Sequence, residues 1–192
     1  MADLIGAMEE AGAILRGHFL LSSGRHSDVY FEKFRILERP ALLSEVCAEI
    51  VNRFADSGVD VVAGPTTGGV IIAFEVARQM GVGAVYIERQ GERRVLRRGA
   101  SLPRGARVLV VDDVLTTGLS VREVIHLLNE AGGDVVGVGL LVDRSEEPVE
   151  FGVPLFAAAC VEAKSYAPDE VPDWLAEIPI TDPGSRRLEP GT

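Results

Sequence analysis

Two adjacent carboxylates, Asp112 and Asp113, stand between an aliphatic run and a loop rich in threonine and glycine. The aliphatic run, 108–111, predicts a strand buried on both faces, which the two acids close. The loop runs from Thr116 to Ser120, where the letters Ser-Val-Arg-Glu fit a capping box and predict a helix start. Free N–H groups and the dipole at a helix start favour phosphate, and the loop hydroxyls add donors. Acids beside such a cradle indicate a ligand with hydroxyls, such as a ribose 5-phosphate, or a metal between acid and anion.

The chain has a second turn of similar composition. Residues 64–70 are rich in glycine and threonine, follow a short buried strand predicted over 59–63, and precede a helix predicted over 71–80. Consecutive backbone N–H groups in such a turn form an anion nest. The plain alternatives are a glycine-rich turn here and, at 108–120, a surface loop with solvated acids. A Walker-type nucleotide loop is excluded, because G-x-x-x-x-G-K-[ST] does not occur in the chain.

The stretch 108–120 resembles the signature of type I phosphoribosyltransferases, which bind 5-phosphoribosyl 1-diphosphate (PRPP). The resemblance implies that the two acids hold the ribose 2- and 3-hydroxyls, that the loop after them binds the 5-phosphate, and that the turn at 64–70 binds the pyrophosphate. It also implies Mg²⁺ bound through PRPP and water, with no protein ligand assigned. The implied PRPP contacts are Thr66, Thr67, Gly68, Asp112, Asp113, Thr116, Thr117, Gly118 and Ser120.

Residues 17–31 predict two short strands joined by a polar turn at 22–27. This segment resembles the N-terminal hairpin of orotate phosphoribosyltransferases, F-x-L-x-S-G-x-x-S, which forms part of a hood over the base. Ser22 stands where many members have a lysine. Arg144 follows a strand predicted over 135–142, at the position whose arginine contacts the orotate carboxylate in the family. The implied orotate contacts are Ser23, Gly24, Thr116 and Arg144.

Each of these base-site features also has a plain alternative. The turn at 22–27 could be an ordinary hairpin turn, and Arg144 could pair with Asp143 or Glu146.

Seven arginines fall inside a 19-residue window whose only acid is Glu92. They are Arg89, Arg93, Arg94, Arg97, Arg98, Arg104 and Arg107. Residues 89–104 show neither helical nor strand periodicity, which predicts a lid or a solvated basic loop. The segment is similar to the mobile catalytic loop of the family, R-K-x-x-K-D-H-G, with Arg89 at the leading position, Arg93 at the second lysine and Val95 in place of the histidine.

The resemblance implies that Arg89, Arg93, Asp112 and Asp113 are the catalytic residues. In the family the loop reaches into the partner's site, which implies a homodimer here.

Composition limits the class of protein. The chain has 192 residues, 47% of them hydrophobic, and we expect a single globular domain over 1–192. A net charge of −10 argues against nucleic-acid binding. No apolar run is long enough to span a membrane, and the start lacks a basic leader, so a cytoplasmic protein is expected. Cys47 and Cys160 are predicted to be small buried residues without a redox or metal role.

Strands near 59, 84, 108, 135 and 155, with helices between several of them, predict an α/β fold with a mostly parallel sheet flanked by helices. Helices are expected over 2–13, 40–56 and from 120 to about 131, and a short one around Trp174. The resemblance implies that residues 1–35, with part of 160–192, form the hood. Both loops, the acids and Arg144 follow strands, so we expect them along one sheet edge at a topological switch point.

The function implied is transfer of phosphoribosyl from PRPP to a ring nitrogen of orotate, a reaction that needs no protein nucleophile. Two alternatives remain open at this point. One is a phosphoribosyltransferase for a purine or another base, and the other is a PRPP-sensing regulator without catalysis.

Overall fold

The computed structural model describes residues 4–21, 23–91, 93–97 and 100–181. The elements in chain order are α1 (Leu4–Glu10), β1 (Ile14–Leu20), β2 (His26–Phe31), α2 (Phe34–Leu37), α3 (Pro40–Phe54), the 3-10 turn η1 (Ala55–Ser57), β3 (Val61–Pro65), α4 (Gly68–Met80), β4 (Gly83–Gln90), β5 (Arg93–Leu96), β6 (Arg107–Leu115), α5 (Leu119–Glu130), β7 (Asp134–Asp143), β8 (Leu155–Cys160), β9 (Ser165–Tyr166), α6 (Asp173–Ala176) and β10 (Ile180–Thr181).

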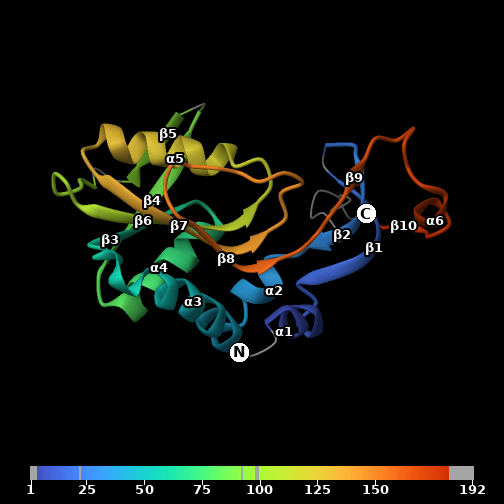
Figure 1. The fold of residues 1–192 in the computed structure, drawn as a ribbon, viewed down its shortest axis with the longest axis horizontal. Helices are drawn as coiled ribbons and strands as arrows, with labels where there is room; N and C mark the ends of the chain where they lie inside the picture. Colours follow the sequence, from blue (N-terminus) through green and yellow to red (C-terminus); the bar gives the residue numbers. More distant parts are fainter. Residues whose placement is uncertain (1–3, 22, 92, 98–99, 182–192) are drawn as a thin grey trace, which may run out of the picture.

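Two sheets organise these elements (Figure 1). The larger sheet has six strands in the order β5-β4-β3-β6-β7-β8, and β5 alone runs antiparallel to its neighbour. Helix α5 covers one face of this sheet, while α3 and α4 cover the other. The predicted α/β class with a mostly parallel sheet is therefore confirmed.

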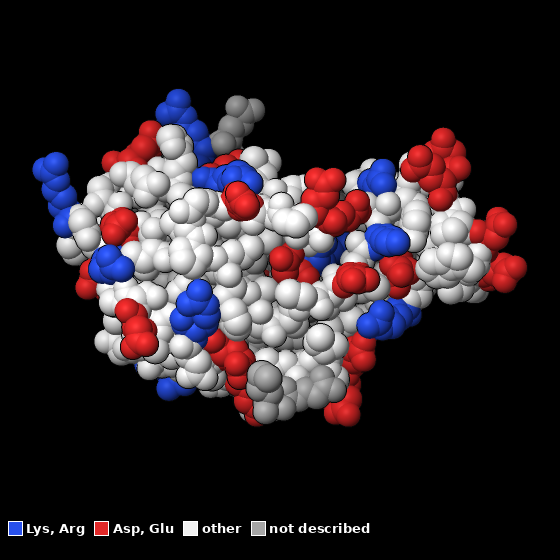
Figure 2. All heavy atoms as spheres, viewed as in Figure 1, with Lys and Arg blue, Asp and Glu red and all other residues white. Residues whose placement is uncertain are grey.

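The smaller sheet has four strands in the order β10-β1-β2-β9 and lies at one end of the molecule (Figure 1). Its outer strands come from 165–181, so segments far apart in sequence meet in it. Acidic and basic side chains lie close together over the waist between the two sheets (Figure 2).

The hydrophobic core on the α3/α4 face of the large sheet is shared with the small sheet. Ile50 and Phe54 of α3 are fully buried there beside Met8 of α1, and Val29 and Phe31 of β2 belong to the same cluster. A second cluster lies under α5 and includes Val108 and Val110 of β6, as expected for a central strand buried on both faces. None of the helices within the described ranges is both long and apolar enough to cross a bilayer.

The prediction of a structureless segment over 89–104 is wrong for its first part. Strand β4 continues to Gln90, and β5 returns antiparallel to it from Arg93 to Leu96. Gly91 has a φ of 62°, which suits a tight turn between the strands. The hairpin lies at the sheet edge and is largely polar, so the alternation that identifies a half-buried strand is missing from its sequence.

Three further expectations need correction. Strand β6 does not stop at the acids but continues to Leu115, because β7 pairs with it as far as Asp143. Strand β3 spans Val61–Pro65, two residues later than expected. Cys160 is exposed because it ends the edge strand β8, whereas Cys47 is buried in α3, where burial raises the pKa of its thiol to about 12.

Candidate functional site

A cavity of about 1450 Å³ lies between the small sheet and the carboxyl edge of the large one. Its walls come from the β1–β2 hairpin and the residues just after it, from the end of β6 with the following loop, and from the segments after β7 and before β9. Strands β3 and β6 are neighbours although β4 and β5 separate them in sequence, and α4 and α5 lie on opposite faces. This is a topological switch point, the place where parallel sheets bind ligands.

The acid pair lies in the last part of β6, and each residue is only 8% exposed. The Asp113 N–H donates to Asp112 Oδ1 over 2.9 Å, and Lys33 Nζ donates to Asp113 Oδ2 over 2.7 Å. The pKa of Asp112 is raised to about 7, first by burial and then by the charge of Asp113, while the hydrogen bond from the Asp113 N–H and the charges of Lys33 and Arg94 act in the opposite direction. Two adjacent buried carboxylates held in this way are suited to accept hydrogen bonds from ligand hydroxyls.

The turn before α4 reaches the same acid pair. A Cβ added to Gly68 would lie 2.2 Å from Asp113 Oδ2, so only a glycine permits this approach. Thr66 and Thr67 are exposed, the peptide bond between them is cis, and the Thr66 N–H donates to the Ile87 carbonyl oxygen over 2.8 Å. The structure thus brings the turn at 66–68 together with the two acids.

The second loop also borders the cavity. Thr116 and Thr117 are exposed on its wall, and Gly118, with a φ of 76°, is the N-cap residue of α5. The predicted capping box is wrong, because α5 begins at Leu119 without a side-chain cap. Ser120 instead lies one residue inside the helix, where its hydroxyl accepts a hydrogen bond from another part of the chain.

That donor is Arg94 of β5, which the sequence analysis did not select. Its Nη2 donates to Ser120 Oγ over 2.8 Å and its Nε donates to Glu123 over 2.9 Å, with the side chain 13% exposed. These charge-assisted bonds take the two groups that the capping box would have used. Arg89 also donates to Glu123, over 3.3 Å, and Arg93 is exposed. Successive side chains of a strand point to opposite faces of the sheet, so a strand predicted at 93–96 would have placed Arg94 on the other face from Arg93.

Arg144, directly after β7, also lines the cavity. Its N–H donates to the Leu115 carbonyl oxygen over 3.0 Å, which joins the ends of β7 and β6. Its Nε is buried without a hydrogen-bond partner among the described residues. Burial lowers the pKa of the guanidinium. Asp143 accepts from Ser145 and Glu146 accepts from Ser165, so the described hydrogen bonds of these two acids go elsewhere.

The hairpin turn of the small sheet contributes Ser23 to the cavity wall, and Gly24 has a φ of 79° in that turn. Ser22, at the position where many family members have a lysine, lies outside the described residues. Arg25 donates through Nε to Ser165 Oγ over 2.9 Å and through Nη2 to the Ser165 carbonyl oxygen over 2.7 Å. These bonds join the β1–β2 hairpin to β9, and both residues line the cavity.

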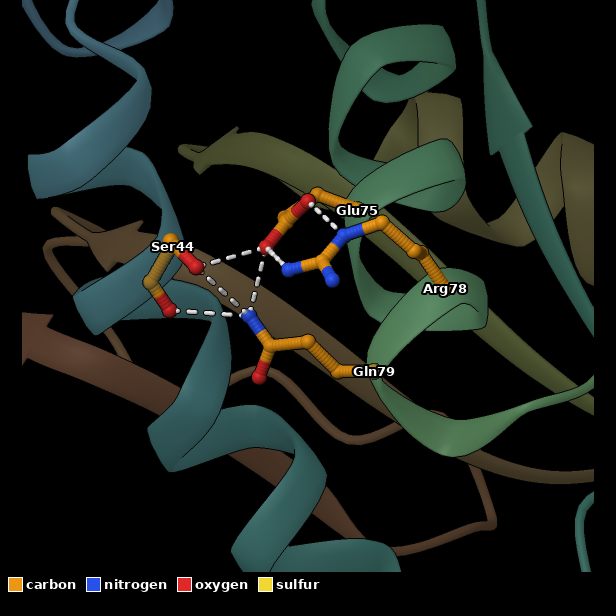
Figure 3. Close-up of polar contacts among 4 residues, drawn as sticks. All are labelled: Ser44, Glu75, Arg78 and Gln79. Carbon is orange, nitrogen blue, oxygen red and sulfur yellow. Dashed lines mark hydrogen bonds and ion pairs between the residues drawn. The ribbon is translucent and has the colours of Figure 1, made fainter.

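Helix α4, which begins at the turn beside the acids, is fastened to α3 by a polar cluster (Figure 3). Glu75 accepts from Arg78 Nε and Nη2 over 2.9 and 2.8 Å, and from Ser44 Oγ and Gln79 Nε2 over 2.7 Å each. The hydrogen bonds from Arg78 hold the pKa of Glu75 down to about 2, and those from Gln79 and Ser44 act in the same direction. The cluster fixes the helix that carries Gly68.

We expect Glu75→Gln to lower the free energy of unfolding by about 1 kcal/mol at pH 7, because the charged acceptor of this cluster is lost. A carboxyl whose pKa is lowered on folding stabilises the fold above its unfolded pKa and loses that effect as the pH falls. The difference between wild type and variant should therefore shrink as the pH is lowered from 4.5 towards 2, which urea unfolding at several pH values would measure. Glu130→Gln, on the exposed end of α5, is the control, and an equal loss in both variants would contradict the assignment.

The described residues contain no group of three or more His, Cys, Asp or Glu side chains arranged to hold a metal ion. Asp112 and Asp113 offer two adjacent carboxylates, and Mg²⁺ is commonly bound by one or two carboxylates together with substrate phosphates and water. The donor set fits an ion that a phosphorylated ligand brings, because two carboxylates are too few for a complete site and the described residues add no third ligand group beside them.

Comparison with known proteins places this geometry among related chains. Residues 35–151 match the model of the phosphoribosyl transferase domain. An orotate phosphoribosyltransferase of Pelotomaculum thermopropionicum is 45% identical over 186 residues, covering 97% of this chain and 98% of the relative. Another, of Caldanaerobacter subterraneus, is 46% identical over 180 residues, covering 94% and 95%.

Solved structures show the same similarity. The orotate phosphoribosyltransferase of Aeropyrum pernix is 31% identical, with a TM-score of 0.72, and the match covers 82% of this chain and 93% of that one. The adenine phosphoribosyltransferase of Rhodothermus marinus has a TM-score of 0.69 at 21% identity, over 84% of this chain and all of that one, which is a likeness of fold alone.

Proposed function

This chain belongs to the orotate phosphoribosyltransferase family, and we infer that it transfers the 5-phosphoribosyl group of PRPP to orotate, giving orotidine 5-phosphate and pyrophosphate. This is a step of pyrimidine biosynthesis. One observation of the site carries the inference: the acid pair, the turn at 66–68 and the loop at 116–118 meet at one sheet edge, beside the cavity that Arg144 also lines. A sugar with a phosphate at each end and a base beside it matches that arrangement.

The proposed roles divide the substrate among the segments. Asp112 and Asp113 accept hydrogen bonds from the ribose 2- and 3-hydroxyls. The loop from Thr116 to Ser120 binds the 5-phosphate at the start of α5, and Thr66, Thr67 and Gly68 bind the pyrophosphate. The positions of these groups on neighbouring strand ends support the division.

The small sheet, with residues 1–35 and part of 160–192, is proposed as the hood over the base. Ser23, Gly24, Thr116 and Arg144 are the proposed orotate contacts. The buried Arg144 Nε, which has no hydrogen-bond partner in the described part of the chain, supports this role, since a guanidinium is suited to bind a carboxylate through two hydrogen bonds.

In the proposed reaction, the orotate ring nitrogen attacks the anomeric carbon as the bond to pyrophosphate breaks, through an oxocarbenium-like state. The chain aligns the two substrates, excludes water and offers hydrogen-bond donors to the departing anion. Arg89 and Arg93 of the β4–β5 hairpin are proposed to act on the leaving group, and Arg94, bound to Ser120, joins them as a candidate. Asp112 and Asp113 would be the carboxylates beside a Mg²⁺ ion that PRPP brings, and that ion would neutralise part of the charge on the departing pyrophosphate.

We also propose a homodimer. Ile71 and Phe74 are 40% and 58% exposed on one side of α4, close to the turn at 66–68. Exposed apolar side chains at helical spacing are suited to an interface with another chain. The protein is proposed to work in the cytoplasm, since both substrates are anions that do not cross a bilayer unaided.

A spectrophotometric assay with PRPP, Mg²⁺ and either orotate or a purine tests the function. We expect turnover of orotate and none of adenine, guanine or hypoxanthine. Turnover of a purine alone would identify a phosphoribosyltransferase for another base. Binding of PRPP without turnover of any base would indicate a regulator.

Arg144→Gln is expected to raise KM for orotate by about tenfold or more, because a charge-assisted hydrogen bond to the carboxylate is lost. The affinity for PRPP should change less than twofold. Steady-state kinetics with each substrate varied in turn would measure the two effects separately. Arg104→Gln, on the turn before β6, is a control outside the cavity, and an unchanged KM for orotate in Arg144→Gln would refute the base-site assignment.

A further inference from the structure

Lys33 lies on the cavity wall and contacts the acid pair, although it belongs to none of the motifs singled out in the sequence. We propose that Lys33 is a PRPP-positioning residue of this chain, whose ammonium fixes Asp113 for the ribose hydroxyls and offers its remaining donors to the diphosphate. The proposal rests on the proposed function, because it takes PRPP as the ligand of the cavity.

The position of Lys33 in the fold gives it this reach. It follows β2 and is the N-cap residue of α2, at the junction between the small sheet and the rest of the molecule. Its side chain is 34% exposed and that of Asp113 is 11% exposed. Asp113 is therefore mostly buried, and the ion pair lies where both residues line the cavity. The ring of Phe34 lies 5.8 Å from the ammonium, on the same wall.

The contacts of Asp113 place the Lys33 ammonium near the turn at 66–68, which is the proposed diphosphate site. Asp113 Oδ2, which accepts from Lys33, is also the atom that a Cβ on Gly68 would strike. Lys33 Nζ therefore donates to the same oxygen that lies against the turn at 66–68. An ammonium has three N–H donors, and the ion pair with Asp113 uses one of them.

The other cations on the described cavity wall contact groups other than the two acids. Arg25 donates to Ser165, and Arg122 lies over the ring of Phe151 at 5.1 Å. The backbone N–H of Arg144 donates to the Leu115 carbonyl oxygen, and its side chain lines the cavity with Nε lacking a hydrogen-bond partner among the described residues. Among these lining cations, Lys33 is the one with an ion pair to the acids.

The choice of lysine at this position also fits the role. The chain has two lysines, Lys33 and Lys164, and 17 arginines. An arginine fork would occupy both oxygens of Asp113 and compete with the ribose hydroxyls, whereas an ammonium is a compact donor that takes one oxygen. Lysine therefore neutralises the acid and leaves its second oxygen to the ligand.

The test compares Lys33→Met, which keeps the aliphatic stem, with Arg35→Met, which removes a neighbouring cation whose partner is Glu38 outside the cavity. Calorimetry with PRPP and Mg²⁺, without orotate, should show a Kd about tenfold higher for Lys33→Met than for wild type, as expected for a lost charge-assisted contact. Arg35→Met should stay within twofold of wild type. KM for orotate should be unchanged in both variants.

A pH profile supplies a readout that a merely structural role would not move. Lys33 and Arg94 both lower the pKa of Asp112, while Asp113 raises it, so loss of Lys33 should move the acid limb of PRPP binding to higher pH. If Lys33→Met does not fold, as judged by circular dichroism, the same measurements are made on Lys33→Gln.

An unchanged Kd for PRPP, or an equal loss in Arg35→Met, would overturn the proposal. The proposed function fails separately, if wild type binds PRPP and does not turn over orotate, and the Kd comparison then still decides the role of Lys33. Absence of PRPP binding by wild type would overturn both.

Discussion

The double variant Asp112→Asn, Asp113→Asn is expected to lose at least about 100-fold in kcat/KM for PRPP, because each acid is proposed to accept a charge-assisted hydrogen bond worth about 1.5–3 kcal/mol from a ribose hydroxyl. An amide keeps the shape of the side chain but not the charge. An assay of orotate consumption at pH 8 would measure the loss.

The same variant is expected to remain folded. Because burial raises the pKa of Asp112 from 3.8 to about 7, its ionisation destabilises the fold progressively over that range of pH and fully above it. Removal of that charge at pH 8 offsets the loss of the ion pair with Lys33, so the melting temperature should be no lower than that of wild type. Asp134→Asn, an exposed residue at the opposite end of the sheet, is the control. Full activity of the double variant would show that the ribose assignment is wrong.

Gly68→Ala should reduce kcat/KM for PRPP by about 100-fold, since close approach at a positioned phosphate loop tolerates little displacement. The added Cβ would lie 2.2 Å from Asp113 Oδ2 and 3.1 Å from its Cγ, so the turn and the acid must separate. The change acts on two proposed subsites together, because the diphosphate loop shifts and Asp113 leaves its position. The Kd for pyrophosphate and the Kd for PRPP should both rise, and calorimetry would measure them.

Gly83→Ala is the matched control for this substitution. A Cβ there would have no atom of the described residues within 4 Å, and Gly83 begins β4 at the far end of the sheet from the cavity. We expect wild-type activity from it. If Gly68→Ala also retained wild-type activity, the turn would not need its contact with the acid pair, and the proposed diphosphate subsite would have to be abandoned.

The parts of the site that could be predicted from sequence are those whose signal is local. Aliphatic residues before Asp112 and Asp113 indicate a buried strand, and the hydroxyls and glycine after them indicate an anion loop. Each feature lies within about ten residues of the next, so the chain order already places them together. The parallel sheet then follows from the alternation of strands and helices.

Long-range contacts account for what was missed. Lys33 meets Asp113 across 80 residues, and Arg94 meets Ser120 across 26, so no spacing in the sequence connects them. The capping box failed for the same reason, since Ser120 and Glu123 have the right identities but their polar groups bind Arg94. Strand β5 was not predicted because its pairing with β4 makes it a strand, and its own residues show no alternation of apolar and polar side chains.

The core that joins Phe54 of α3 to Val29 and Phe31 of β2 has a consequence for cooperativity. The small sheet and the α3/α4 face of the large sheet share one set of buried side chains, so we expect neither sheet to lose its packing while the other stays intact. The walls on both sides of the cavity therefore form and melt in a single transition. A substitution of a core residue under α3 would therefore impair the cavity by unfolding the whole domain, and we expect no partly open intermediate.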